Sequence, residues 1–160
     1  MRLYPDFLPV ISGEPVVGDF EVARIDAERG EGVIAQRRFS AGEPLFRMNG
    51  IPKREITQHT LQMGPGRHLH DPWVAGKVLH SCEPNSRLDV KTRRFYAVRD
   101  IAPGDLLTMD YDETEDVLFR SFECCCGAPS CRGLIAGRNV PTTLVPLVAV
   151  EDAAALAAAE

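Results

Sequence analysis

The chain has 160 residues and an ordinary apolar content of 44%, which fits one globular domain. Its formal net charge of −5 at pH 7 argues against a nucleic-acid partner, because phosphate binding requires a basic face. It has no apolar run of about 18 residues, so we expect no membrane span. The first residues lack the apolar core and cleavage site of a secretory signal. We therefore expect a cytoplasmic protein, and the Ala- and Arg-rich composition suits a bacterial source.

The first third of the chain predicts an irregular arm followed by short strands. Residues 1–19 are rich in proline and glycine. From Phe20 onward, β-forming stretches at 20–25, 33–35 and 44–46 alternate with glycine-containing turns. Residues 52–63 are predicted to form one short helix with Pro52 in its first turn. Residues 64–76, which hold three glycines and two prolines, are predicted to be a loop.

The rest of the chain predicts more short strands and one terminal helix. Residues 88–90 and 95–98 are typical of a hairpin, and a turn at 101–105 leads into a strand at 106–111. The acidic run 110–116 is predicted to be solvated. The alanine-rich residues 153–159 favour a helix that is docked, frayed or used as a dimer contact. Many short strands and few helices indicate a mainly β fold.

Five cysteines give the strongest chemical signal. One lies in the block HSCEPN at residues 80–85, and four lie within residues 124–131, where Cys124, Cys126 and Cys131 have a C-x-C-x4-C spacing. Without a secretion signal, such a cluster favours metal ligation over disulfides, and zinc takes four thiolates at tetrahedral angles. Alternation along the chain turns Cys125 away from its neighbours; the alternative for any single cysteine is a small buried apolar residue. The predicted Zn²⁺ ligands are Cys82, Cys124, Cys126 and Cys131.

Four motifs in this order resemble those of SET-domain lysine methyltransferases that carry a post-SET zinc segment. They are RGEGV with FSAGE at 29–33 and 39–43, HSCEPN at 80–85, GDLLTMDY at 104–111, and the cysteine run at 124–133. The resemblance spans about residues 20–135. It implies small β-sheets, few short helices and a C-terminal pseudoknot in which the second and third motifs meet. The expected division is an N-terminal arm (1–19), the SET domain (20–115), the post-SET segment (116–137) and a tail (138–160).

The same resemblance implies a site for S-adenosylmethionine and a channel for a lysine of a protein substrate. It makes Tyr111 the catalytic residue, and Asn85 a brace of the loop. The implied cofactor-binding residues are Gly30, Glu31, Gly32, Leu79, His80 and Tyr111. From the residues alone, Tyr111 is also consistent with a core tyrosine, His80 with a structural hydrogen bond, and the two glycines with a plain turn.

Three positions depart from the family pattern. Leu79 stands where an asparagine usually helps to hold the cofactor, Gly76 where an arginine is common, and Met109 where Phe or Tyr often tunes the methylation state. The leading prediction is methyl transfer to a protein lysine. Two other functions stay open: methyl transfer to a small-molecule amine, and a catalytically silent zinc module that only binds a partner. A homodimer is also possible.

Overall fold

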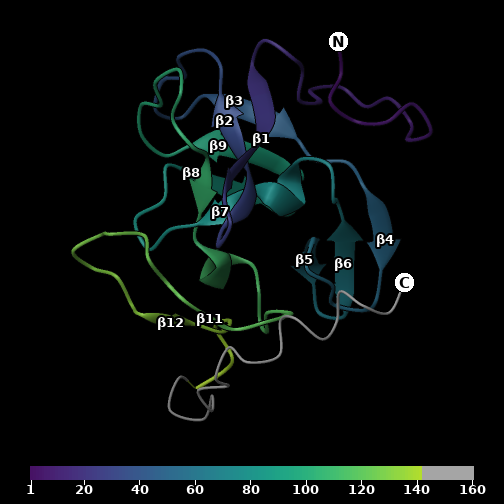
Figure 1. The fold of residues 1–160 in the computed structure, drawn as a ribbon. Helices are drawn as coiled ribbons and strands as arrows, with labels where there is room; N and C mark the ends of the chain where they lie inside the picture. Colours follow the sequence, from purple (N-terminus) through teal and green to yellow (C-terminus); the bar gives the residue numbers. More distant parts are fainter. Residues whose placement is uncertain (142–160) are drawn as a thin grey trace.

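The computed structural model describes residues 1–141 and confirms the mainly β fold (Figure 1). The predicted terminal helix at 153–159 lies outside the described residues. None of the helices within 1–141 is long and apolar enough to cross a membrane. The elements in chain order are β1 (Phe20–Asp26), β2 (Gly30–Ala35), β3 (Pro44–Arg47), β4 (Ile51–Lys53), β5 (Thr60–Gly64), β6 (Arg67–His70), η1 (Ala75–Lys77), β7 (Leu79–His80), β8 (Ser86–Asp89), β9 (Arg94–Ala97), β10 (Thr108–Met109), η2 (Tyr111–Glu113), β11 (Phe122–Glu123) and β12 (Leu134–Ile135).

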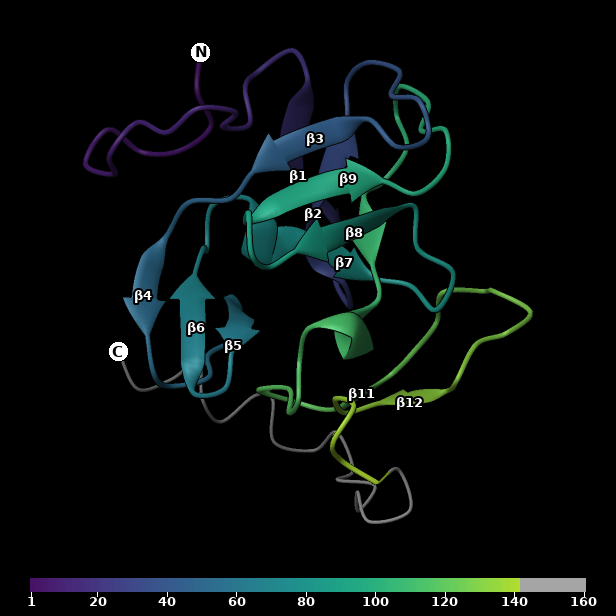
Figure 2. The same cartoon turned by 180° about the vertical axis from the view of Figure 1, so that it is seen from behind.

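Five small sheets make up the described chain. β1 and β2 form a hairpin, β3-β9-β8 and β4-β6-β5 form three-stranded sheets, and β11 pairs with β12. β7 and β10 form a short parallel pair. Figure 2 shows β3, β9 and β8 together at one end, β4-β6-β5 on one flank, and β11 with β12 at the opposite end. The predicted hairpin around residues 91–94 is confirmed as β8 and β9.

Buried phenylalanines from β1, from the β3-β9-β8 sheet and from the segment between β2 and β3 form the centre of the core. The rings of Phe20 and Phe39 stack at 5.1 Å, and those of Phe46 and Phe95 at 4.7 Å. An edge contact of 5.3 Å between Phe20 and Phe46 joins the two pairs. Such aromatic pairs bury large apolar areas and add about 1 kcal/mol each beyond that burial. The β1–β2 hairpin is thereby fixed against the β3-β9-β8 sheet.

The helix predicted over residues 52–63 is wrong, because this stretch supplies two strands of one sheet. β4 and β5 pair with opposite edges of β6, which itself lies in the stretch predicted as a loop. Leu61 and Leu69 are register partners and are both buried. Packing against distant residues outweighs local propensity in such strands. Likewise, the strand expected over 106–111 is reduced to Thr108–Met109, and Tyr111 opens η2.

Residues of the irregular N-terminal arm and of the acidic run, which was expected to be solvated, are packed on the core. In the N-terminal arm, Tyr4 and Leu8 are buried, and the Tyr4 hydroxyl donates a 2.6 Å hydrogen bond to Asp71 Oδ2. In the acidic run, Glu115 is only 5% exposed, and its Oε1 accepts a 2.8 Å hydrogen bond from the amide of Gln62. The prediction of a solvated acidic run is therefore wrong at Glu115, which ties this run to β5.

Candidate active site

The second and third motifs meet where β7 runs parallel to β10. Thr108 lies opposite Leu79, and Met109 lies opposite His80. The side chain of Asn85 fixes this contact: its Nδ2 donates to the carbonyl of Leu106 at 2.9 Å, and its Oδ1 accepts from the amide of Thr108 at 2.9 Å. Asn85 thus braces the loop, as predicted. The contact places Tyr111 directly beside the HSCEPN block.

Tyr111 is held at both ends of the residue by the segment around β7. Its hydroxyl donates a 2.8 Å hydrogen bond to the carbonyl of Val78, and its amide donates to Nδ1 of His80 at 3.2 Å. Burial, with a smaller contribution from the charge of Glu115, raises the pKa of Tyr111 well above its ordinary value. The hydroxyl is therefore neutral at physiological pH, and its proton stays in the hydrogen bond to the carbonyl of Val78.

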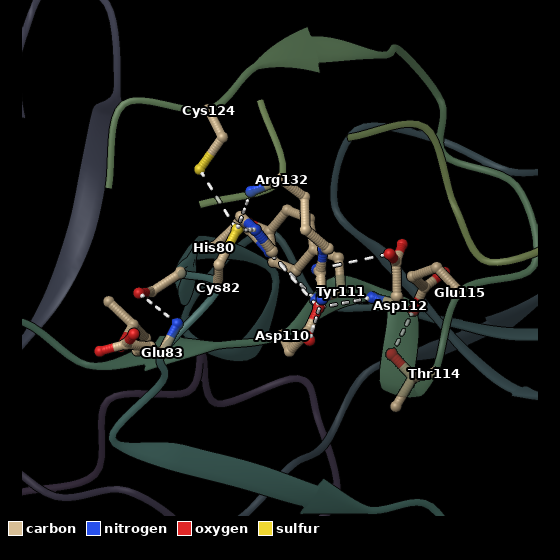
Figure 3. Close-up of polar contacts among 12 residues, drawn as sticks. His80, Cys82, Glu83, Asp110, Tyr111, Asp112, Thr114, Glu115, Cys124 and Arg132 are labelled. Atoms are coloured by element: carbon tan, nitrogen blue, oxygen red, sulfur yellow. Dashed lines mark hydrogen bonds and ion pairs between the residues drawn. The ribbon is translucent and has the colours of Figure 1, made fainter. Parts of the chain in front are cut away.

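His80 is a neutral imidazole with a defined tautomer. Its ring is 1% exposed and lies 5.1 Å from the ring of Tyr111. Burial lowers the pKa of His80, which the charge of Asp110 only partly offsets. Because Nδ1 accepts the Tyr111 amide hydrogen, the proton resides on Nε2, which lies 3.4 Å from Sγ of Cys82 (Figure 3). The ring thus links the tyrosine to the cysteine cluster.

A cleft of about 700 Å³ opens beside this tyrosine. Among the predicted cofactor-binding residues, those that line it are Gly30, Glu31, Leu79, His80 and Tyr111. Gly32 lies outside the lining, and a Cβ there would approach Leu106 Cδ1 to 2.7 Å, so close packing explains this glycine. Gly30 has a φ of 72°, which a hairpin turn requires and which favours glycine. A cleft of this size can hold a cofactor.

Lys77 and His59 also line the cleft, and motif comparison did not single them out. Lys77 Nζ lies 2.7 Å from Glu31 Oε2. His59 Nδ1 lies 3.1 Å from the carbonyl of Gly76, within hydrogen-bonding distance. Lysine within η1 carries no motif signal of its own, and only the packing of η1 against β2 brings it to the glutamate.

The four predicted zinc ligands come together at the far side of His80. Their sulfur atoms all lie within 4.8 Å of one another, and the sulfurs of Cys82 and Cys124 are 3.9 Å apart. A tetrahedral zinc with bonds of about 2.3 Å places its sulfurs roughly 3.8 Å apart, so the cluster fits the ion in chemistry and size. Backbone amide hydrogen bonds lower the pKa of Cys126 to about 6, whereas burial raises the pKa of Cys82 and of Cys124, so without an ion the thiolate resides first on Cys126. Cys125 is exposed, as its alternation predicts.

Arg132 ties the cysteine segment to the tyrosine. Its guanidinium pairs with both carboxylate oxygens of Asp110, with Nη1 at 2.8 Å from Oδ2 (Figure 3). The Phe122 ring lies 6.1 Å from that of Tyr111 and 5.8 Å from that of His80. An ion pair and an aromatic contact therefore connect the cysteine segment to the wall of the cleft.

Comparison with known proteins identifies the fold. The SET domain family model matches residues 30–112, which contain β2, the HSCEPN block and Tyr111. The chain belongs to the SET-domain family. The resemblance predicted from its motifs is thereby confirmed.

Relatives of this SET domain are methyltransferases. It is 36% identical over 89 residues to Methyltransferase flvH of Aspergillus flavus, covering 54% of this chain and 50% of that protein. It is 40% identical over 68 residues to a histone-lysine N-methyltransferase, H3 lysine-4 specific, of Schizosaccharomyces pombe, covering 39% of this chain and 7% of that protein. The chain therefore spans about half of the first relative and a small part of the second. Together they support methyl transfer as the family-level activity.

A solved structure shares the fold of this SET domain. The crystal structure of KRYPTONITE in complex with mCHH DNA, H3(1-15) peptide and SAH matches with a TM-score of 0.57 and 26% identity. The match covers 72% of this chain and 29% of that chain.

Proposed function

We propose that this SET domain transfers a methyl group from S-adenosylmethionine to the side-chain amine of a lysine in a protein substrate. One observation carries the proposal: the hydroxyl of Tyr111 is fixed beside a cleft whose wall also contains Gly30, Glu31, Leu79 and His80. The comparison proteins support it, because one is named as a histone-lysine methyltransferase and one was solved with an H3 peptide and SAH.

The residues of the cleft suit the chemistry of an amine acceptor. S-adenosylmethionine, when bound, supplies a methyl group on a positively charged sulfur. A lysine has a pKa of about 10.4 and must lose a proton before its nitrogen can attack. Apolar lining side chains such as Leu79, Leu118 and Phe122 disfavour the charged ammonium. Because the Tyr111 proton is donated to Val78, the hydroxyl lone pairs stay free to accept an N–H of the amine and orient it.

The cysteine cluster would then hold Zn²⁺ as a structural ion. A zinc with four thiolates has no open position for substrate, so it stabilises the fold without taking part in the chemistry. Here it would fix residues 124–131 against the HSCEPN block. Through Arg132 and Asp110 the ion would support the segment that carries Tyr111.

The test is a calorimetric titration of the zinc-loaded protein with S-adenosylmethionine, followed by methyl-transfer assays with a radiolabelled donor. Acceptors are histone H3 peptides, free L-lysine and small diamines, with Tyr111→Phe as the control for background transfer. Saturable binding with label in peptide lysine supports the proposal. Label only in free amines would replace the acceptor by a small molecule. Absence of donor binding by the folded, zinc-loaded protein would contradict the proposal and favour a catalytically silent zinc module that only binds a partner.

A further inference from the structure

A buried carboxylate outside the cleft organises the turn that precedes β7. Asp71 follows β6 directly, is 0% exposed and does not line the cleft. Its Oδ1 accepts hydrogen bonds from the amides of Trp73 and Val74 at 3.1 and 2.9 Å, and its Oδ2 accepts one from the amide of Ala75 at 2.9 Å. The loop before η1 and the first residue of η1 are therefore held by one side chain.

The backbone of Asp71 extends this support to the end of η1. Its carbonyl accepts a 2.9 Å hydrogen bond from the amide of Gly76, and a side chain at position 76 would collide with the same oxygen. The amide of Val78 then closes the turn on the carbonyl of Ala75 at 3.1 Å. The next carbonyl is that of Val78 itself, which accepts the Tyr111 hydroxyl hydrogen at 2.8 Å. The position of this acceptor thus depends on the turn that Asp71 organises.

Tyr4 of the N-terminal arm supplies the fourth hydrogen bond to this carboxylate. Its hydroxyl donates to Oδ2 of Asp71 at 2.6 Å and accepts from the amide of Asn49 at 3.1 Å. The residue is 2% exposed. Each carboxylate oxygen thus accepts two hydrogen bonds in a site closed to water. Removing one donor leaves a buried oxygen short of a partner, which favours a rearrangement of the carboxylate and of the turn bound to it.

Packing alone does not account for a tyrosine at position 4. The ring lies edge-on to that of Trp73, with 6.5 Å between the ring centroids, and belongs to the hydrophobic core. A phenylalanine would fill the same space without burying a hydroxyl, and a buried hydroxyl is unfavourable unless it is hydrogen-bonded. The hydroxyl of Tyr4 therefore has a role at Asp71 beyond filling the core.

We propose that Tyr4 is a positioning residue for methyl transfer: through Asp71 and η1 it fixes the carbonyl that orients the Tyr111 hydroxyl. This inference rests on the proposed function. Neither Tyr4 nor Asp71 lines the cleft, so neither contacts the ligands bound there. Their effect reaches the reaction only through the direction in which the Tyr111 hydroxyl points. The N-terminal arm is thereby part of the framework of the active site as well as a cover for the core.

The test is a double-mutant cycle on single-turnover methyl transfer to the H3 peptide by the zinc-loaded protein, saturated with S-adenosylmethionine. Tyr4→Phe removes only the hydroxyl and is measured in the unmodified protein and in Tyr111→Phe. Asp71→Asn repeats the cycle one step closer to η1. Ile101→Val trims a buried side chain away from the cleft and controls for a similar loss of stability. Urea denaturation shows that each variant is folded, and calorimetry measures its donor affinity.

Tyr4→Phe is expected to lower the single-turnover rate on the order of 10-fold at nearly unchanged donor affinity, since a displacement of about 1 Å at a reacting group costs up to about 10²-fold. In Tyr111→Phe the same substitution should change the rate by less than about 2-fold, because no hydroxyl remains to be misdirected. Asp71→Asn should show the same dependence on Tyr111. Ile101→Val should leave the rate unchanged, and hydrogen exchange of the Val78 amide should be faster in Tyr4→Phe than in this control.

Two kinds of result separate this role from the proposed function. An unchanged rate in Tyr4→Phe, equal losses from it in both backgrounds, or a matching loss in Ile101→Val would overturn the positioning role and leave the proposed function standing. If the unmodified protein binds no donor, or transfers no methyl group to the peptide, the proposed function fails and the positioning role fails with it.

Discussion

The hydroxyl of Tyr111 donates a 2.8 Å hydrogen bond to the backbone carbonyl of Val78, so a main-chain atom fixes the position of this side chain. The amide of the same tyrosine donates to Nδ1 of His80, which lies two residues after Val78 in the chain. A single short segment therefore sets both the backbone and the side chain of Tyr111. The arrangement orients the hydroxyl before any ligand is bound, which is the form of preorganisation that favours catalysis.

Tyr111→Phe is expected to lower the rate of methyl transfer on the order of 10²-fold, because the orienting oxygen is lost. The variant should retain zinc and donor binding, and lose about 1 kcal/mol of stability with the hydrogen bond to Val78. Single-turnover methyl transfer and urea denaturation measure the two effects. Tyr96→Phe, a substitution on β9 away from the cleft, is the matched control. An unchanged rate for Tyr111→Phe would contradict the catalytic assignment.

Local patterns predicted the parts of the fold that depend on local sequence. The hairpin of β8 and β9 was predictable because its turn joins adjacent strands, and the cysteine set because zinc requires ligands of one type at close spacing. β4 and β5 were not predictable from local sequence, since each is defined by pairing with β6. Their register depends on burial of partners such as Leu61 and Leu69, which no local propensity encodes.

The candidate site divides in the same way. Tyr111 and His80 could be found because they lie within motifs whose spacing is fixed by the β7–β10 contact. The ion pair of Glu31 and Lys77 could not, because it depends on how η1 packs against β2. By sequence, Gly76 is a departure from the arginine common at this position. In the structure, the backbone oxygens of Asp71 and His59 come so close to Gly76 that only glycine fits there.

Cys131→Ser is expected to lower the zinc content and, with it, methyl transfer, because a serine hydroxyl is a poor substitute for a thiolate ligand. Cys125→Ser is the matched control, since Cys125 is exposed and lies outside the group of four sulfurs. Elemental analysis after dialysis against a mild chelator measures the metal in both variants. Equal zinc loss from the two variants, or full occupancy in Cys131→Ser, would contradict the ligand set.

Asn85→Ala is expected to destabilise the protein by about 2 kcal/mol or more, because the Leu106 carbonyl and the Thr108 amide lose their partner together. The loss should appear in the free energy of unfolding measured with urea at constant zinc. Asn139→Ala, at an exposed position near the end of the described chain, controls for removal of an amide side chain. If both variants unfold at the same urea concentration, Asn85 does not brace the β7–β10 contact.

Glu115→Gln is expected to stabilise the protein increasingly as the pH rises. Burial is the main cause that raises the pKa of Glu115 above its ordinary value. Between about 4.3, the value in an unfolded chain, and that higher pKa, the folded state binds more protons than the unfolded state. The free energy of unfolding contributed by Glu115 therefore falls as the pH rises through this window. A glutamine cannot ionise, and its Oε1 can still accept from Gln62 and Thr114.

Urea denaturation of both proteins from pH 5 to 7.5 with saturating zinc measures this difference, which should grow with pH and then level off. Each unit by which burial raises the pKa adds about 1.4 kcal/mol to the plateau. Glu123→Gln removes the same charge from an exposed position and controls for net charge. The prediction is wrong if the difference in the free energy of unfolding between the two proteins stays constant with pH. In that case ionisation does not destabilise the buried carboxylate, because its hydrogen bonds outweigh its desolvation.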